Sequence, residues 1–275
     1  MEYNWLWGLV YGLLGGLFEF LPVSSQVHQE VLTKLAGLAD PGQGMTLAVH
    51  IGALTAVTVS CRGELAKISR ERKLASQPPR RRRRQPDIVS LAQLRLLKTA
   101  AVPLVLSCVA APWIARYIRS LWQMALLAIL CGILVLLPEH MSRGNKDARG
   151  LSPLDAILLG LAGIGGAIPG LSRVAAITSV GSMRGADRSF TLEFTYLLLV
   201  PALGALCLGD MGFLLFGYGG GTPLLPGILA CIASFGASFV GIRLMRFLAV
   251  KDGYENLAYY NLGLALFTFI LYLIG

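Results

Sequence analysis

Long apolar segments separated by short polar ones make up most of this chain. Six uninterrupted apolar runs approach the roughly 17 to 25 residues that a helix needs to cross a bilayer. These runs cover residues 45–61, 99–118, 121–138, 190–209, 223–242 and 257–274. The pattern therefore predicts an all-α integral membrane protein with about six transmembrane helices.

Two further apolar regions, 6–21 and 154–168, are interrupted by proline and by polar residues. The interruptions read Pro22-Val23-Ser24-Ser25 and Pro169-Gly170-Leu171-Ser172-Arg173, and short helical stretches follow them at 25–38 and 174–184. Irregular backbone at membrane depth is tolerated only where protein or a watery cavity satisfies its polar groups. Interrupted segments in corresponding positions of two halves are typical of an inverted repeat with a central site.

Two interpretations of the interrupted segments are open. They are either ordinary spans kinked by proline or re-entrant helical hairpins that enter and leave the membrane on one side. Hydroxyl groups at both breaks, and an arginine at the second, favour the hairpins. We therefore predict one polytopic domain over residues 1–275, with about six transmembrane helices plus two re-entrant helical hairpins in an inverted repeat.

Composition excludes a soluble protein, because 55% of the residues are hydrophobic and only 14% are charged, against about 25% charged in a typical soluble domain. Segment 62–98 holds twelve basic and three acidic residues, which is the whole net charge of +9. We interpret it as a basic cytoplasmic loop, partly disordered around the arginines at 80–84, that contacts anionic membrane lipids. No aromatic residues interleave the basic run, so no nucleic-acid partner is expected.

Positive charge also predicts the orientation of the other connections. Counting spans onward from the basic segment makes 139–151 and 243–254 cytoplasmic, whereas 210–222, which has neither lysine nor arginine, falls outside. Both termini are then expected outside. Arg116 and Arg119 disagree with this topology, because they lie in a short connection on the outer side.

The first break and its flanks concentrate polar groups that are costly at membrane depth and that by default mark a function. Glu19 is suited to act as a general base or to hold a divalent cation. Ser25 is a candidate nucleophile, and His28 is a candidate to activate it or to protonate a leaving group. The alternative is that Ser24 and Ser25 only cap the following helix, which does not explain Glu19 together with His28.

The second break places Ser172 and Arg173 at or near a helix N-terminus. Arginine there offers a planar fork of donors to a phosphate, and free backbone amides add to the attraction for an anion. The alternative is that Arg173 snorkels to an interface or pairs with a structural carboxylate. If the two breaks face each other, they form a site for a phosphorylated, lipid-tailed molecule.

His50 is expected to be a packed or hydrogen-bonded helix residue rather than a catalyst.

Several motifs resemble a known family at this point. Glu19-Phe-Leu-Pro-Val-Ser-Ser25, followed by His28, resembles the signature of the bacterial undecaprenyl pyrophosphate phosphatases of the bacitracin-resistance type. Pro169–Arg173 is similar to the second signature of that family, and 194–201 is similar to the segment that follows it. The resemblance implies six spans plus two re-entrant hairpins in an inverted repeat, often assembled as a homodimer.

The implied activity is removal of the terminal phosphate of undecaprenyl pyrophosphate, which regenerates the monophosphate carrier for cell-wall synthesis. The resemblance also implies a divalent cation, Mg²⁺ or Ca²⁺, with Glu19 as a metal ligand, and a site open to the outer side of the bacterial plasma membrane. It implies catalytic functions for Glu19, Ser25, His28 and Arg173. Ser24 and Ser172, which are adjacent in sequence to Ser25 and Arg173, are expected to bind the substrate together with Arg173.

Five residues at three sites depart from the pattern of that family. Gly15 stands where a second glutamate is expected one turn before Glu19, Gln26-Val27 replaces Thr-Gly, and Val174-Ala175 replaces Ser-Gly. Loss of a carboxylate removes half of a plausible metal or acid–base unit. Two hypotheses follow: a membrane polyprenyl pyrophosphate phosphatase, or a non-catalytic homologue that binds or translocates a polyprenyl phosphate. A structural subunit with a relic site is a third.

Overall fold

The computed structural model describes residues 4–82, 84–218, 222–251 and 254–275. Within these ranges the chain is helical and has no β-strand beyond an isolated bridge between Lys146 and Ala186. The six long apolar helices are α3 (Gln43–Ser60), α5 (Ile88–Ala115), α6 (Leu121–Leu136, continued by η2, Leu137–His140), α9 (Arg188–Leu215), α10 (Leu224–Lys251) and α11 (Tyr254–Ile274). Their lengths and hydropathies confirm the predicted all-α membrane fold with six spans.

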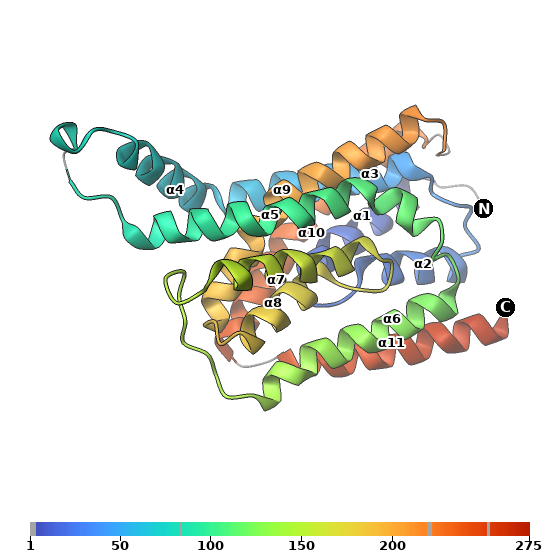
Figure 1. Cartoon of the computed structure of the whole chain (residues 1–275). Helices are drawn as coiled ribbons and strands as arrows, with labels where there is room; N and C mark the ends of the chain where they lie inside the picture. Colours follow the sequence, from blue (N-terminus) through green and yellow to red (C-terminus); the bar gives the residue numbers. More distant parts are fainter. Residues whose placement is uncertain (1–3, 83, 219–221, 252–253) are drawn as a thin grey trace.

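The two interrupted regions form pairs of short helices, as predicted. The pairs are α1 (Trp5–Glu19) with α2 (Ser25–Leu35), and α7 (Pro153–Ile164, continued by η3, Gly165–Ala167) with α8 (Arg173–Met183). At about 1.5 Å per residue, none of the four is long enough to cross a bilayer alone. Each pair turns at its break, so both breaks lie inside the helical bundle (Figure 1).

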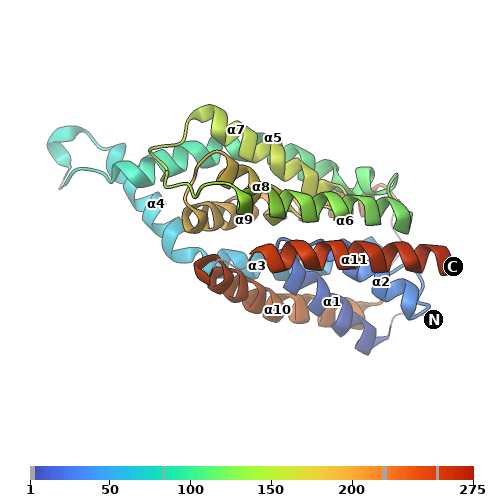
Figure 2. The same cartoon turned by 90° about the horizontal axis from the view of Figure 1, so that it is seen from below.

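Helix packing repeats between the first and the second half of the chain. Helix α1 packs on α10 as α7 packs on α5, and α3 packs on α10 as α9 packs on α5. The corresponding helices α3 and α9 pair with each other, as do α6 and α11, which lie side by side in Figures 1 and 2. Exchanging the halves therefore preserves the packing, which is the arrangement of an inverted repeat.

The basic segment is more helical than the expected loop. Helix α4 (Arg62–Ala75) and the short η1 (Pro79–Arg81) project from one end of the bundle (Figure 1) before α5 begins at Ile88. The carboxylate of Glu71 accepts hydrogen bonds from the guanidinium of Arg84 and from the backbone N–H of Asp87 (2.9 Å). These bonds lower the pKa of Glu71, the Arg84 bond most of all. Arg83 in the arginine run lies outside the described residues.

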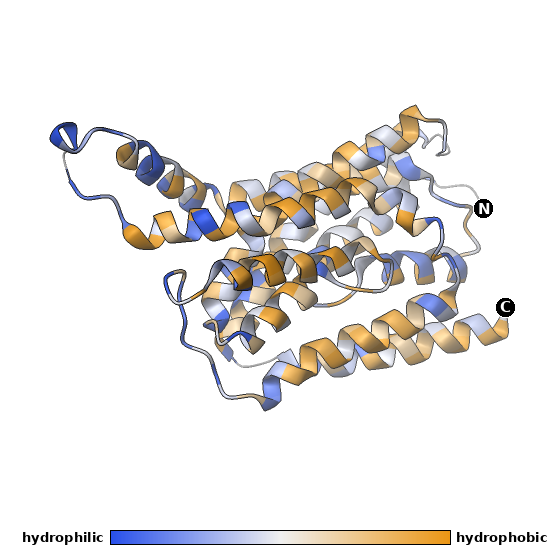
Figure 3. Cartoon of the chain, viewed as in Figure 1, coloured by the Kyte–Doolittle hydropathy of each residue, from blue (hydrophilic) through white to orange (hydrophobic). Residues whose placement is uncertain are grey.

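Hydrophobic and polar surfaces separate along the molecule. Large apolar side chains such as Val102, Leu106, Leu126 and Leu266 are exposed on α5, α6 and α11, which is expected of helices that face lipid. Polar residues gather on α4 and on the connections (Figure 3). The start of α1 and the end of α11 lie at the end of the bundle opposite α4 (Figure 1), in agreement with an even number of crossings.

Candidate active site

The two helix breaks meet in the centre of the bundle. The hydroxyl of Ser172, at the second break, donates a hydrogen bond to the carbonyl oxygen of Leu21 at the first break (3.0 Å). The side-chain amide of Asn261 on α11 donates to the carbonyl oxygen of Pro22 (2.8 Å). These donors satisfy carbonyl groups that the end of α1 leaves without helical partners. Sequence reasoning missed Asn261, although an amide inside an apolar span is a signal for such a partner.

Arg173 forms a buried ion pair with Glu19 across the two breaks. One terminal nitrogen of its guanidinium lies 2.5 Å from Glu19 Oε1, and the other donates to the carbonyl oxygen of Gly166 (2.8 Å). The third nitrogen, Nε, is buried without a partner. A Cβ at Gly166 would lie 1.7 Å from Arg173 Cγ, so this glycine leaves the space through which the arginine reaches Glu19.

The serines have two different positions. Ser24 and Ser172 are N-cap residues, whose hydroxyls accept the backbone N–H of Val27 (3.4 Å) and Ala175 (3.3 Å). Ser25 is not used in this way: its hydroxyl donates to Glu19 Oε2 at 2.9 Å. The cluster therefore contains a hydroxyl whose proton already points at a carboxylate, beside an arginine with a free donor.

His28 is held apart from that cluster. Its Nδ1 lies 2.6 Å from the carbonyl oxygen of Ser24, and its Nε2 lies 2.6 Å from the hydroxyl of Tyr260 on α11. The ring also stacks on Phe18 with a centroid distance of 3.7 Å. Both ring nitrogens are thus engaged away from Ser25, so the structure groups Glu19, Ser25 and Arg173 but does not join His28 to them.

His50 is hydrogen-bonded, as expected, but to a carboxylate that sequence reasoning missed. Its Nδ1 lies 2.6 Å from Asp210 Oδ2, and the other oxygen of Asp210 accepts the side-chain amide of Gln43 (2.7 Å). His50 and Asp210 are both buried. This hydrogen bond joins α3 to α9, and 160 residues separate its two members.

The space beside the Glu19–Arg173 pair is small. A crevice of about 10 Å³ is lined by residues of both breaks, including Glu19, Ser25, Ser172 and Arg173. Such a volume holds about one water molecule. The crevice is therefore closed around its own ion pair and has no room for a phosphate group.

Comparison with known proteins places these residues in a family. Residues 8–267 match the family described as Bacitracin resistance protein BacA. The chain belongs to this family. The undecaprenyl-diphosphatase of Nocardioides sp. is 32% identical over 99% of this chain and 98% of its own. The undecaprenyl-diphosphatase of Paenarthrobacter aurescens is 28% identical over 97% of both chains, and undecaprenyl-diphosphatase 2 of Frankia casuarinae is 31% identical over 98% of this chain and 94% of its own.

Neighbouring side chains fill the place of the missing glutamate in this family member. A Cβ at Gly15 would lie 2.5 Å from both Gln29 Nε2 and Val49 Cγ1. The Gln29 amide in turn donates to the carbonyl oxygen of Tyr11 (3.4 Å). At the second break, Val174 and Ala175 are completely buried and pack in the core. The departures at Gly15 and at Val174-Ala175 are thus accommodated while the Glu19–Arg173 pair is retained.

The residues present fit a divalent cation only in part. The described residues contain no cluster of three or more His, Cys, Asp or Glu side chains that could hold a metal ion. Glu19 is the one carboxylate among the residues that line the crevice. Mg²⁺ is commonly held by one or two carboxylates together with water and substrate phosphates. The donor set therefore fits a cation that arrives with a pyrophosphate better than a resident ion.

Proposed function

We propose that this protein hydrolyses undecaprenyl pyrophosphate to undecaprenyl phosphate and inorganic phosphate, in the recycling of the cell-wall carrier lipid. The observation that supports this most is the contact of Ser25 and Arg173 with the same carboxylate, Glu19. A hydroxyl, a carboxylate and a guanidinium lie together at the junction of the two breaks, and the proposal takes them as nucleophile, proton acceptor and phosphate-binding cation. Full-length relatives named undecaprenyl-diphosphatase support the same substrate.

In the proposed reaction, Arg173 exchanges its contact with Glu19 for the terminal phosphate of the substrate. The Ser25 hydroxyl, or a water in its place, attacks the terminal phosphorus and transfers its proton to Glu19. The bond between this phosphorus and the bridging oxygen breaks, and undecaprenyl phosphate leaves with the bonding electrons. If Ser25 attacks, water then hydrolyses the phosphoserine to release phosphate. Ser24 and Ser172 hold the two helix N-termini toward the anion.

A divalent cation, Mg²⁺ or Ca²⁺, belongs to this proposal with Glu19 as its protein ligand. When bound, it would offset the negative charge of the pyrophosphate. We assign His28 to this site as well. Because its nitrogens contact Ser24 and Tyr260, its contribution in this conformation is to position α2, and proton transfer by His28 requires release of the Tyr260 hydroxyl.

The proposed activity also implies a location and an orientation for the protein. We place the protein in the bacterial plasma membrane, with the site open to the outer side and α4 on the cytoplasmic side. Exposed arginines on α4, such as Arg62, Arg70 and Arg72, suit contacts with anionic lipids. A homodimer is a further expectation, which the mass of the detergent-solubilised protein tests.

Binding or translocation of a polyprenyl phosphate without hydrolysis is the second candidate function. The packing of α1 on α10 and of α7 on α5 relates the two halves around a central site, and such repeats suit alternating access. This function predicts that the purified protein binds undecaprenyl phosphate but releases no phosphate from undecaprenyl pyrophosphate.

Phosphate release from undecaprenyl pyrophosphate by the purified protein, with Mg²⁺, Ca²⁺ or EDTA, tests the proposal. The wild type is expected to turn over, and Glu19→Gln to lower kcat by about 100-fold or more, because a positioned base contributes about 10² to 10⁴. Glu255→Gln is the matched control, since this exposed carboxylate lies at the start of α11. No release by folded, lipid-binding wild type would reject the phosphatase in favour of the second candidate.

A further inference from the structure

A second and much larger hollow lies beside the catalytic crevice. A cavity of about 470 Å³ opens between α2, the connection from α2 to α3, and the end of α5. Gln26 lines both this cavity and the crevice. The cavity lies at the end of the bundle where α11 ends, away from α4. It is large enough for a phosphate or pyrophosphate group, which the crevice cannot hold.

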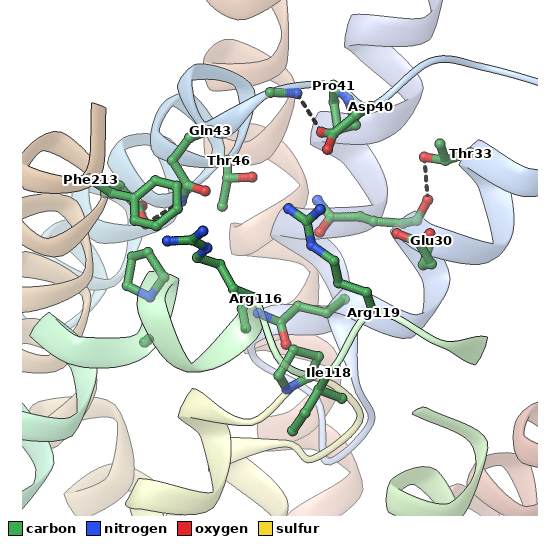
Figure 4. A pocket seen from close by; sticks show the side chains of 18 of the residues that line it. Glu30, Thr33, Asp40, Pro41, Gln43, Thr46, Arg116, Ile118, Arg119 and Phe213 are labelled. Atoms are coloured by element: carbon green, nitrogen blue, oxygen red, sulfur yellow. Dashed lines mark hydrogen bonds between the residues drawn. The ribbon is translucent and has the colours of Figure 1, made fainter. Parts of the chain in front are cut away.

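Two arginines of the turn after α5 point into this cavity. Arg116 and Arg119 extend toward its centre in Figure 4. The guanidinium of Arg116 lies over the ring of Tyr218, 4.8 Å from its centroid, and near that of Phe213. An arginine stacked in this way keeps the donors at its edge free for a planar or tetrahedral anion.

Two of the three acidic residues that line the cavity, Asp40 and Asp210, accept hydrogen bonds from other groups. Asp210 uses its two oxygens for Gln43 and His50. Asp40 accepts the backbone N–H of Gly42 (2.9 Å). Glu30 interacts electrostatically with Arg119, but no ion pair within 4 Å joins a carboxylate to Arg116 or Arg119 in the part of the chain that the structure describes.

We propose that this cavity is a second anion site, in which Arg116 and Arg119 bind a phosphate group in front of the catalytic crevice. The proposal rests on the phosphatase function for the source of that group, which is either the released inorganic phosphate or the headgroup of the incoming lipid. It also accounts for the two arginines that disagree with the positive-inside topology. A polar, basic cavity beside the closed crevice provides an intermediate binding position for phosphate between the crevice and the outer solution.

The test has a binding arm and a kinetic arm, with Arg116→Gln, Arg119→Gln and the matched control Arg243→Gln. Arg243 is exposed on α10 and does not line the cavity. Equilibrium dialysis with inorganic phosphate measures Kd, and turnover of undecaprenyl pyrophosphate measures KM. Loss of one charge-assisted contact is expected to weaken the affected constant by about tenfold, and thermal unfolding in detergent shows that each variant is folded.

The two arms distinguish the source of the phosphate. A weaker Kd with unchanged KM identifies free phosphate, and a higher KM with unchanged Kd identifies the lipid headgroup; either outcome supports the site. Values for both arginine variants that stay within twofold of the wild type in both arms overturn it. If the wild type releases no phosphate, the proposed phosphatase function fails, and the dialysis arm alone decides whether Arg116 and Arg119 bind the anion.

Discussion

Ser24 and Ser172 begin their helices in the same way, each accepting a backbone N–H one turn ahead, yet the next residue differs between the two breaks. It is Ser25 in α2 and Arg173 in α8. The first break thus contributes a hydroxyl and, through Glu19, a carboxylate, whereas the second contributes a cation. One backbone geometry, repeated in the two halves, presents complementary chemistry across the interface between them.

The chemical difference between the two breaks allows their interface to form a polar site. Two identical breaks would bring like groups together, and like charges at close range in a low dielectric repel strongly. Here the pairing of Glu19 with Arg173 keeps both charges compensated at membrane depth. The remaining acceptor of Glu19 is then available to Ser25. We expect substitutions at corresponding positions to have unequal effects, and four comparisons test this.

Arg173→Ala is expected to have the largest effect. It removes the phosphate-binding cation and leaves Glu19 buried without its partner, a loss of about 3 to 5 kcal/mol. Phosphate release should fall by about 10² to 10⁴, and thermal unfolding in detergent should occur at lower temperature. The double variant Glu19→Gln/Arg173→Ala should recover stability without activity. Turnover of Arg173→Ala within tenfold of the wild type would contradict the assignment of this residue.

Comparison of Ser25→Ala with Ser24→Ala should distinguish the proposed nucleophile, Ser25, from the helix N-cap, Ser24. Ser25→Ala is expected to lower kcat by about 100-fold or more, because the attacking hydroxyl is removed. Ser24→Ala, like Ser172→Ala, should cost about 1 kcal/mol of stability through loss of the cap and change kcat by less than about tenfold. A kcat for Ser25→Ala within tenfold of the wild type, measured by steady-state kinetics, would reject Ser25 as the nucleophile and leave water in that position.

Gly166→Ala tests the path of the arginine at the second break. The new Cβ would overlap Arg173 Cγ, and relief of such overpacking costs about 1 to 3 kcal/mol. We expect phosphate release to fall by about 10- to 100-fold. Gly165→Ala is the control, because its Cβ would meet only Leu171 Cδ1 at an ordinary 3.4 Å. Similar rates for the two variants would show that Arg173 reaches Glu19 by another route.

Tyr260→Phe should have the smallest effect. It removes the hydroxyl that contacts His28 Nε2, a hydrogen bond of about 1 kcal/mol. If His28 only positions α2, activity should fall no more than about fivefold. Tyr259→Phe, at an exposed neighbouring position, is the control. An increase in kcat for Tyr260→Phe would instead show that release of Nε2 allows His28 to transfer protons.

Sequence alone determined the membrane fold and the location of the breaks. The length of each apolar segment determines which helices can cross a bilayer. Unpaired polar groups are costly in lipid, so Glu19, Ser25 and Arg173 are candidate functional residues from their place in apolar segments alone. The interruptions likewise predicted short helices from about residues 25 and 174, and the helices begin at Ser25 and Arg173. These inferences need only local composition and general solvation energies, so they do not depend on how the helices are arranged.

Only the tertiary structure decided which polar groups are partners. Asp210 lies 160 residues from His50, and Tyr260 lies 232 residues from His28. No local pattern fixes such pairs, because they depend on the rotation and register of packed helices. The same packing directed His28 toward α11 rather than toward Ser25, and filled the space beside Gly15 with Gln29. Side-chain direction at a helix interface is a property of the assembled bundle, which one chain segment cannot encode alone.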